Sequence, residues 1–279
     1  MIIVIGATGP VGRSAITLLR EAGHGVAAVT RRPGSALLPE GVRVIGADPS
    51  EPGALDAHWE GVAGVLLSPR AAGPEAANLL RTAAARGVRR VAVISSATVV
   101  HPAGEPRFAE GFKAAERAAE DSGLEWTHLR CSDFATNALA WAPQVPSGAV
   151  RGAYAKAASS TIHERDIAAV AVKALTESGH GGRAYVLTGP ESLTQTRKAQ
   201  LIGEAIGRDL AYVELAPEQV RAAMLAQGLP EEIPARLLGS LADFAREAGP
   251  STGTVERLLG RPALTFGQWA VEYAAAFRS

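Results

Sequence analysis

The sequence predicts an α/β fold in which a doubly wound parallel sheet is joined to a smaller, mainly helical C-terminal part. Between residues 1 and about 130, short β-branched runs alternate with longer stretches whose apolar residues recur at helical spacing. The runs are apolar at nearly every position, which suits parallel strands covered by helices on both faces. Beyond residue 190 the pattern is mainly helical.

Brief polar or glycine-containing turns separate the predicted elements, as in repeated βαβ units. The predicted strands are Ile2–Ile5, Val26–Val29, Val42–Ile45, Gly64–Leu67, Val91–Ile94 and Trp126–Leu129. The predicted helices between them are Val11–Glu21, Glu75–Ala85 and Phe108–Ser122, and Gly23, Gly87 and Gly123 follow these helices where C-terminal caps belong.

The second half of the chain departs from this alternation. Proline, glycine and small residues from Pro143 to Ser160 predict a long loop over the site. A helix at Arg165–Thr176 and a strand at Ala184–Leu187 return to the sheet, and helices at Arg197–Ile206, Pro217–Gln227 and Glu232–Glu247 follow. We therefore expect a nucleotide-binding domain from 1–150 with 162–190, and a helical substrate-covering region from 191–279.

The composition argues against nucleic acid and membranes as binding partners. The chain has 279 residues, and its 28 lysines and arginines balance 28 aspartates and glutamates, so no net field favours nucleic acid or an anionic membrane. No apolar run approaches the ~18 residues of a membrane span. The opening residues run into a glycine turn without the basic region of a secretory signal, and the single cysteine, Cys131, suits a reducing compartment. We expect a soluble cytoplasmic protein with a small-molecule partner.

A glycine turn directly follows the first predicted strand and opens the first helix. It reads Gly6-Ala7-Thr8-Gly9-Pro10-Val11-Gly12. In this context the glycines allow a sharp turn, a close approach of backbone to a pyrophosphate, and tight packing of helix on strand, while amides at the helix start face the phosphates. The turn predicts a Rossmann-type dinucleotide site with binding residues Gly6, Thr8, Gly9, Pro10, Val11 and Gly12.

The end of the second strand indicates which dinucleotide is bound. Sites that prefer NAD(H) place a carboxylate about 20 residues beyond the glycines, whereas an arginine there pairs with the 2′-phosphate of NADP(H). This chain has Arg31 and Arg32 at that point. We therefore predict NADP(H) rather than NAD(H), with Asp48 at the end of the third strand as an acceptor for the adenine amino group. The alternative for both arginines is that they are solvated loop charges.

Further candidates follow other predicted strands, at the carboxyl edge where open α/β sheets bind ligands. Leu67, Ser68 and Ser95 are predicted to contact the cofactor. Ser96, Phe134 and Tyr154 are predicted to contact substrate. Cys131 is expected to be inert packing. The six histidines lack metal-ligand spacing, so no metal site is expected, and the charged run 163–166 is interpreted as a helix start.

Several of these residues together resemble the NmrA-like branch of the atypical short-chain dehydrogenase/reductases. The resemblance covers nearly the whole chain. It implies a Rossmann fold, an NAD(P) cofactor, and an activity that is either reduction of quinones, dyes or unsaturated aromatic compounds, or redox sensing without turnover. The residues that carry it are the glycine turn, Arg31, Asp48, Val93-Ile94-Ser95-Ser96, Lys113, Glu116, Leu129-Arg130, Arg165-Asp166-Ile167-Ala168, Leu187-Thr188-Gly189-Pro190, Gly260-Arg261-Pro262 and Phe266.

The chain departs from the wider superfamily at the catalytic tyrosine. Active members carry a tyrosine four residues before a lysine; Lys113 matches the lysine, but Ala109 occupies the tyrosine position. A ketone reduced to an alkoxide needs an acid within hydrogen-bond reach, whereas a quinone leaves a stabilised anion. The departure favours delocalised acceptors, with solvent or Lys113 supplying the proton late. Lys113 is expected either to contact the nicotinamide ribose or to pair with Glu116, and Tyr154 is the candidate substitute proton donor.

Three functions follow from these observations. The first is an NADP(H)-dependent oxidoreductase that delivers hydride to a quinone-like or conjugated small molecule. The second is a non-catalytic NADP(H) sensor that acts through a protein partner. The third is a ketoreductase or isomerase of specialised metabolism with Tyr154 or a substrate group as the acid. Association between copies through helix 108–122 is compatible with the sequence, as is core packing of that helix.

Overall fold

The computed structural model describes residues 1–278, which fold into two compact units. Unit 1 consists of Met1–Val99, Glu110–Cys131 and Glu164–Val186, and unit 2 of Val100–Ala109, Ser132–His163 and Leu187–Ser279. The division expected from the sequence differs in assigning residues 100–109, 132–150, 162–163 and 187–190 to the nucleotide-binding part. Across residues 1–278 no helix combines the length and apolar character that a membrane span requires.

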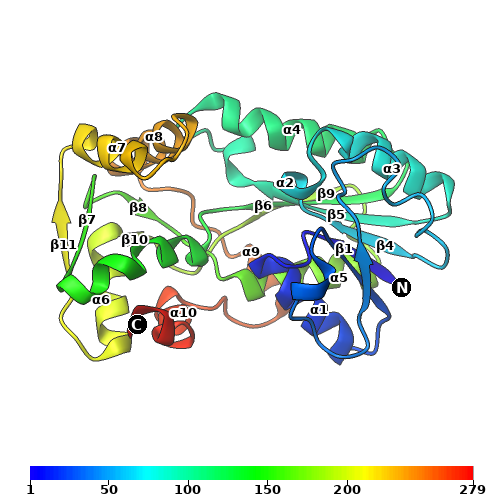
Figure 1. Ribbon diagram of the computed structural model, residues 1–279, viewed down its shortest axis with the longest axis horizontal. Helices are drawn as coiled ribbons and strands as arrows, with labels where there is room; N and C mark the ends of the chain where they lie inside the picture. The colour runs from blue at the N-terminus through cyan, green and yellow to red at the C-terminus, as the bar shows by residue number, and fades with distance from the viewer. Residues whose placement is uncertain (279) are drawn as a thin grey trace. The chain divides into compact units, whose positions relative to one another are not determined.

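Unit 1 is built on a seven-stranded parallel sheet with helices on both faces, as the sequence predicts. The strand order is β3-β2-β1-β4-β5-β6-β9. Figure 1 shows α1 and α5 on one face and α3 and α4 on the other. The strands are β1 (Ile2–Ile5), β2 (Val26–Thr30), β3 (Arg43–Gly46), β4 (Gly64–Leu67), β5 (Arg90–Ser96), β6 (Glu125–Cys131) and β9 (Arg183–Leu187). The helices are α1 (Pro10–Glu21), α2 (Pro69–Ala72), α3 (Ala76–Ala85), α4 (Pro106–Glu120) and α5 (Glu164–Thr176), with 3₁₀ turns η1 (Pro33–Ser35), η2 (Gly73–Glu75) and η3 (Ala97–Val99).

The strand order creates a topological switch point at β1. From β1 the chain adds β2 and β3 on one side and then returns to add β4 on the other, so β1 pairs with both β2 and β4. Every residue of β1 and β4 is buried, because the helices cover both faces and favour apolar side chains on each. Open α/β sheets bind ligands in the crevice at such a switch point, beyond the carboxyl ends of the strands.

Unit 2 has its own core around Trp269, which packs against the rings of Phe266 and Phe277. Its elements are η4 (Ala135–Ser147), β7 (Ala149–Gly152), β8 (Ala158–Ser159), β10 (Leu193–Thr194), α6 (Gln195–Ile206), β11 (Ala211–Glu214), α7 (Pro217–Ala226), α8 (Glu232–Arg246), α9 (Thr254–Leu259), α10 (Phe266–Glu272) and α11 (Ala274–Arg278).

The long loop predicted for Pro143–Ser160 is wrong in part. That stretch contains the end of η4 and two short strands, of which β7 pairs in parallel with β11 and β8 pairs antiparallel with β10. The partners lie more than thirty residues further along the chain, so no local pattern in the loop indicates the pairing. Short strands of small residues acquire their stability from such distant partners rather than from intrinsic propensity.

Candidate dinucleotide site

The glycine turn after β1 is shaped by two close approaches that only glycine permits. Gly6 has φ of +92°, and a Cβ atom there would lie 2.7 Å from Cβ of Ser68, just beyond β4. A Cβ on Gly12 would collide with the carbonyl oxygen of Gly6. The turn is closed by a hydrogen bond from the Gly9 amide to that same carbonyl, at 3.0 Å. Side chains at Gly6 and Gly12 would therefore force the turn away from β4 and the helix start away from the turn.

The start of α1 has the properties of an anion site. Gly9 occupies the N-cap position and offers no side chain to the first amides, Pro10 stands at the first helical position, and the first turn carries no acidic residue. The early amides of a helix have no intrahelical partner, and the helix dipole adds partial positive charge there. The helix starts at the carboxyl end of β1, at the switch point, so the residues fit a dinucleotide phosphate.

Arg31 and Arg32 follow β2, with Asp48 beyond the end of β3. The side chain of Arg31 is 75% exposed and its Nη1 lies 3.9 Å from Oδ2 of Asp48. Asp48 accepts hydrogen bonds from the hydroxyl and amide of Ser50, at 2.7 and 3.0 Å. These bonds, with a smaller contribution from Arg31, lower the pKa of Asp48. An exposed ion pair of this length holds a guanidinium weakly, so Arg31 is available to a phosphate.

Arg13 was not singled out by the sequence, yet it braces this half of the site. Its Nε donates to the carbonyl of Thr8 at 2.9 Å, and its Nη1 donates to the carbonyl of Leu37 at 2.6 Å. One side chain therefore ties the glycine turn to the segment that follows the two arginines. An arginine directly after the third glycine is the only sequence signal for it.

The other half of the carboxyl edge carries Leu67, Ser68, Ser95 and Ser96. Leu67 is fully buried in the core, which leaves its backbone for a ligand. The Ser68 amide bonds to the carbonyl of Ile5 at 3.1 Å, which fixes the end of β4 beside the glycine turn. The Ser95 hydroxyl donates to Oε1 of Glu116 at 2.6 Å, and the Ser96 hydroxyl lies 2.8 Å from that of Thr98. The ligand contacts predicted for these four residues stay predictions.

The expected pairing of Lys113 with Glu116 is wrong. Lys113 donates to Oε1 of Glu110 at 2.8 Å on the exposed side of α4. Glu116 is 4% exposed and faces the sheet instead. A helix brings both i−3 and i+3 neighbours within reach, and the exposed carboxylate competes better for a solvated ammonium because pairing there costs no burial of charge. Contact of Lys113 with a nicotinamide ribose stays a prediction.

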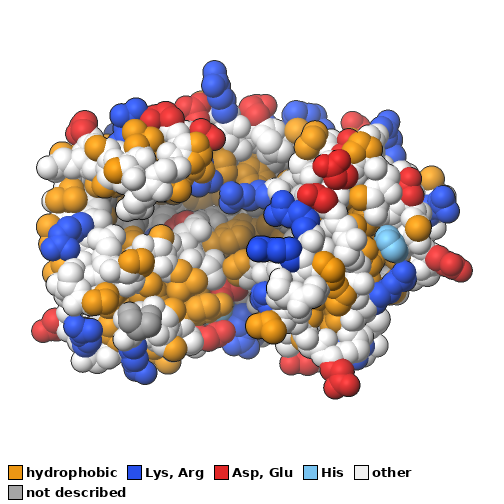
Figure 2. Space-filling model, in the orientation of Figure 1, with side chains coloured by type: hydrophobic (Ala, Val, Ile, Leu, Met, Phe, Trp, Pro, Cys, Tyr) orange, Lys and Arg blue, Asp and Glu red, His pale blue; other side chains and the backbone are white. Residues whose placement is uncertain are grey.

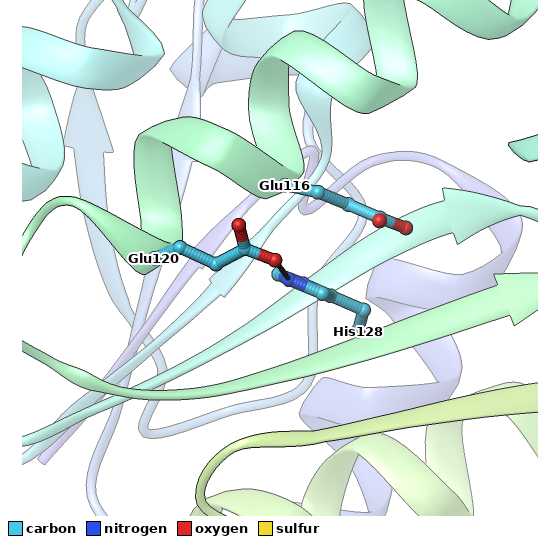
Figure 3. A group of neighbouring side chains, drawn as sticks. All are labelled: Glu116, Glu120 and His128. Atoms are coloured by element: carbon cyan, nitrogen blue, oxygen red, sulfur yellow. Dashed lines mark hydrogen bonds and ion pairs between the residues drawn. The ribbon is translucent and has the colours of Figure 1, made fainter.

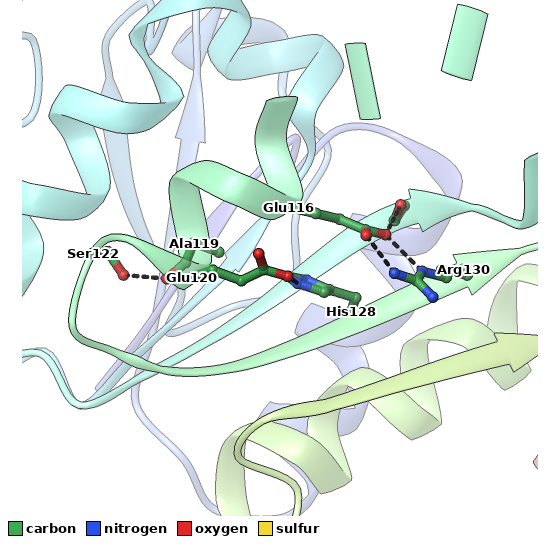
Figure 4. Close-up of polar contacts among 7 residues, drawn as sticks. Glu116, Ala119, Glu120, Ser122, His128 and Arg130 are labelled. Atoms are coloured by element: carbon green, nitrogen blue, oxygen red, sulfur yellow. Dashed lines mark hydrogen bonds and ion pairs between the residues drawn. The ribbon is translucent and has the colours of Figure 1, made fainter. Parts of the chain in front are cut away.

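Glu116 is the centre of a buried network (Figure 4). Arg130 donates from Nε to Oε1 and from Nη2 to Oε2 of Glu116, at 2.9 and 2.7 Å, and Ser95 adds the third bond. Burial raises the pKa of Glu116, but the hydrogen bonds from Arg130 and Ser95 outweigh it and the pKa lies below its usual value. The sequence indicated Arg130 only through the resemblance. Arg130 lies just beyond the predicted strand Trp126–Leu129, so no local pattern pointed to its partner.

A second polar contact, between buried His128 and exposed Glu120, lies one helical turn further along α4. His128 is fully buried, stacks on Trp126 and shares a 3.0 Å hydrogen bond with Glu120. Glu116, Glu120 and His128 have ligand atoms within 4.8 Å of one another, as Figure 3 shows. Both oxygens of Glu116 already accept from the Arg130 guanidinium, whose charge opposes a cation. The expectation that the protein holds no metal stays a prediction.

Phe134 and Tyr154, the remaining candidates for substrate contact, belong to unit 2. Phe134 bridges in parallel to Ile162, and Tyr154 has φ of +55°, a backbone conformation that costs a non-glycine residue about 1 kcal/mol or more. Contact of Phe134 and Tyr154 with a substrate stays a prediction. Cys131 is buried, and burial raises the pKa of its thiol, which is consistent with inert packing.

The sequence missed a buried lysine in unit 2. Lys198 on α6 is 2% exposed, donates to the Ser159 hydroxyl at 2.8 Å and lies 3.4 Å from Oδ2 of Asp133. Burial lowers the pKa of Lys198, and Asp133 opposes that shift. Asp133 also accepts from Asn137 at 2.6 Å. A lysine in a helical pattern is ordinarily solvated, so its position gave no signal.

Comparison with known proteins decides the family. A family model described as NAD(P)H-binding matches residues 6–178, more than half of the chain. The chain belongs to this NAD(P)H-binding family. The matched span starts at the first glycine of the turn and contains the whole carboxyl edge described above. The predicted membership of an NAD(P)-binding Rossmann family is therefore confirmed.

Members of the family with known activities match over the full chain. The (4-alkanoyl-5-oxo-2,5-dihydrofuran-3-yl)methyl phosphate reductase of Streptomyces griseus is 36% identical over 280 residues, which cover 99% of each chain. The NAD(P)H azoreductase of Xenophilus azovorans is 34% identical over 286 residues, again 99% of each. The NADPH-dependent quinone oxidoreductase of Escherichia coli in complex with NADPH superposes with a TM-score of 0.81 at 26% identity and covers 100% of both chains.

Proposed function

We propose that this protein is an NADP(H)-dependent oxidoreductase that transfers hydride from nicotinamide to a quinone-like or conjugated small molecule. The observation that carries the proposal is the start of α1. Uncapped amides there follow a tight turn whose packing requires Gly6 and Gly12, at the switch point of the sheet. Arg31 and Arg32 add the positive charge that a 2′-phosphate attracts.

The relatives support the same class of reaction and cofactor. They are named as reductases of an alkanoyl dihydrofuranone phosphate, of azo compounds and of quinones, and the structural relative was crystallised with NADPH. Such acceptors share double bonds that spread an added electron pair over several atoms. A bound nicotinamide supplies the hydride, and the chain supplies binding and orientation. Ala109, four residues before Lys113, is consistent with an acceptor that needs no tyrosine acid.

The experiment is NADPH oxidation followed at 340 nm with a panel of quinones, azo dyes and conjugated enones. We expect sustained NADPH consumption with some members of the panel and slower consumption when NADH replaces NADPH. Simple ketones serve as the matched control and should react poorly, because their alkoxide products need an acid. Tight NADPH binding without oxidation across the whole panel would contradict the proposal.

The alternative of a redox sensor is favoured by Ala109 alone. A sensor must bind NADPH and NADP⁺ with different affinities, because a ligand with equal affinity for two states shifts neither. Calorimetric titration of both cofactors therefore separates the two functions: equal affinities combined with turnover leave only the oxidoreductase.

We further propose that the protein works in the cytoplasm, in keeping with its NADP(H) site and lone buried cysteine.

A further inference from the structure

Arg130 lies at the edge of the sheet that the dinucleotide site occupies. It is the penultimate residue of β6 and pairs in register with Ser95 near the end of β5. The glycine turn emerges from the same edge at the end of β1, and Ser68 follows β4 there. In the strand order, β5 and β6 lie on the β4 side of β1, opposite β2 and β3 with their two arginines and Asp48. The adenosine half and the half that contains Arg130 are therefore on different sides of the switch point.

The guanidinium of Arg130 is held firmly but is not saturated. Two of its nitrogens form the bidentate pair with Glu116, and in Figure 4 the third nitrogen points away from that carboxylate. Within residues 1–278 no hydrogen bond involves this third nitrogen, Nη1, and the side chain is 20% exposed. Bidentate pairing fixes the plane of a guanidinium. Two N–H groups are thus presented in a defined direction at the carboxyl edge.

Three other polar side chains of unit 1 considered for this half of the site are already engaged. The Ser95 hydroxyl donates to Glu116, the Ser96 hydroxyl is paired with Thr98, and Lys113 is paired with Glu110. Arg130, by contrast, offers free donors together with a fixed charge.

We propose that Arg130 is the oxyanion-binding residue of the reaction, with Nη1 donating hydrogen bonds to the oxygen on which negative charge collects as the acceptor is reduced. The inference rests on the proposed reductase function. Preorganised donors aimed at developing charge lower the barrier most when they need no rearrangement during the reaction. Glu116 and Ser95 are positioning residues that hold the guanidinium in place.

The balance of the step is simple for a quinone. Hydride brings two electrons and one hydrogen, so NADPH becomes NADP⁺ and the quinone becomes a hydroquinone monoanion. Arg130 stabilises that anion without giving up a proton, since the hydrogen bond with Glu116 raises the pKa of Arg130 further. Water supplies the second proton after hydride transfer. Acceptors whose anions are delocalised are compatible with this arrangement because their protonation can come late.

A phenolate probe tests the inference without requiring turnover. In the complex with NADP⁺, 4-nitrophenol is titrated with pH, because its phenol and phenolate forms absorb at different wavelengths. We expect the wild-type complex to bind phenolate about ten-fold or more tightly than phenol, as a charge-assisted hydrogen bond implies. This appears as a lowering of the pKa of the bound probe by about one unit or more.

The variants are chosen so that a loss of probe binding cannot be explained by unfolding of the protein. Arg130→Gln alone leaves Glu116 buried without its cation, which destabilises the folded chain. The comparison is therefore between E116Q, which keeps Arg130, and the double variant E116Q/R130Q, which replaces the ion pair by two amides. The matched control is R90Q, because Arg90 is a partly buried arginine at the opposite end of β5 and is also paired with a carboxylate, Glu125.

We expect R90Q to keep the preference for phenolate in full, E116Q to keep it in reduced form because Arg130 loses the carboxylate that positions it, and E116Q/R130Q to lose it. Equal preference in E116Q and E116Q/R130Q would overturn the inference, as would a wild-type complex that shows no preference or does not bind the probe. In kinetics, the plot of log kcat/KM against the acidity of the hydroquinone product should be steeper for E116Q/R130Q than for E116Q. A phenolate preference without any turnover would refute the proposed function but not the role of Arg130.

Discussion

At the scale of single residues, we propose that the two arginines after β2 determine the choice between NADPH and NADH. Arg31 is highly exposed and only loosely paired with Asp48, so a 2′-phosphate meets little competition for it. In the proposed site, Arg31 and Arg32 would attract the 2′-phosphate of NADPH. Without the two arginines, the negative charge of Asp48 would repel that phosphate.

We predict that R31A/R32A weakens NADPH binding by about ten- to one hundred-fold, the range expected for lost charge-assisted hydrogen bonds. NADH binding should change little, because NADH lacks the phosphate. The measurement is a fluorescence titration of each reduced cofactor, with R86A as the control because Arg86 is exposed at the end of α3, remote from β2 in sequence. Equal losses for both cofactors would indicate a general distortion rather than loss of a phosphate contact.

Some residue positions could be predicted from the sequence, whereas the partners of buried side chains could not. Arg31 and Arg32 were predictable because they follow a recognisable strand in a βαβ unit, at a known distance from the glycines. The Glu116–Arg130 pair joins a helix to a strand 14 positions away, and nothing local distinguishes it from pairing of Glu116 with Lys113. The choice between those partners depends on which face of α4 is buried.

At the scale of elements, the junction of β1 and α1 is the most constrained part of unit 1. Gly12 lies against the carbonyl of Gly6 with no room for a methyl group. We predict that G12A moves the helix start and weakens NADPH binding about ten-fold or more, since each displaced amide–phosphate bond is worth about 1.5–3 kcal/mol. Titration with NADPH measures the loss, and thermal unfolding reports the accompanying strain.

G111A is the matched control for that substitution. Gly111 lies in the middle of α4 with open space where a Cβ would be. Alanine there should stabilise the helix by up to about 1 kcal/mol and leave NADPH affinity unchanged. A comparable loss of affinity in both variants would contradict the steric explanation for G12A.

Elements were predictable where burial imposes a simple pattern. The six strands and three helices of the first 130 residues were found because parallel strands covered on both faces must be apolar throughout, and each is long enough to show it. Strands β7, β8, β10 and β11 were not found, because β8 and β10 have only two residues each, while the four-residue β7 and β11 each contain a charged residue and lack a continuous apolar run. Helices α9 to α11 have five to seven residues each and were missed because so short a stretch shows little helical periodicity. Packing around Trp269 accounts for α10 and α11.

At the scale of the whole molecule, positive and negative charges are equal in number. Figure 2 shows both signs on the face it presents, with several basic side chains gathered near the middle of the view. Stability should therefore depend on pH through particular buried groups rather than through net charge. His128 is the foremost of these, because burial lowers the pKa of its imidazole despite the hydrogen bond with Glu120.

We predict that stability falls as pH drops through about 6.5, the value for an unfolded histidine. Below that pH the unfolded chain takes up a proton that folded His128 resists, so the free energy of unfolding decreases until the lowered folded pKa is passed. One such group contributes a slope of at most about 1.4 kcal/mol per pH unit. Urea unfolding at pH 5 to 8 measures it.

H128Q should reduce this slope, and H101Q should leave it unchanged because His101 is exposed. Some slope should remain in H128Q, since burial also lowers the pKa of His180. A slope that is identical in H128Q and the wild type would show that other groups control the acid response.

The two units interleave along the chain, each being made of three separate segments. A single backbone cut between residues 110 and 163 would leave parts of both units on each fragment, so proteolysis cannot release either unit intact. The same holds for recombination between genes. A continuous piece of coding sequence that encodes all of unit 2 also encodes parts of unit 1, so neither unit can be exchanged as a cassette. Descendants of this chain can acquire a new substrate preference only by substitutions and insertions made in place.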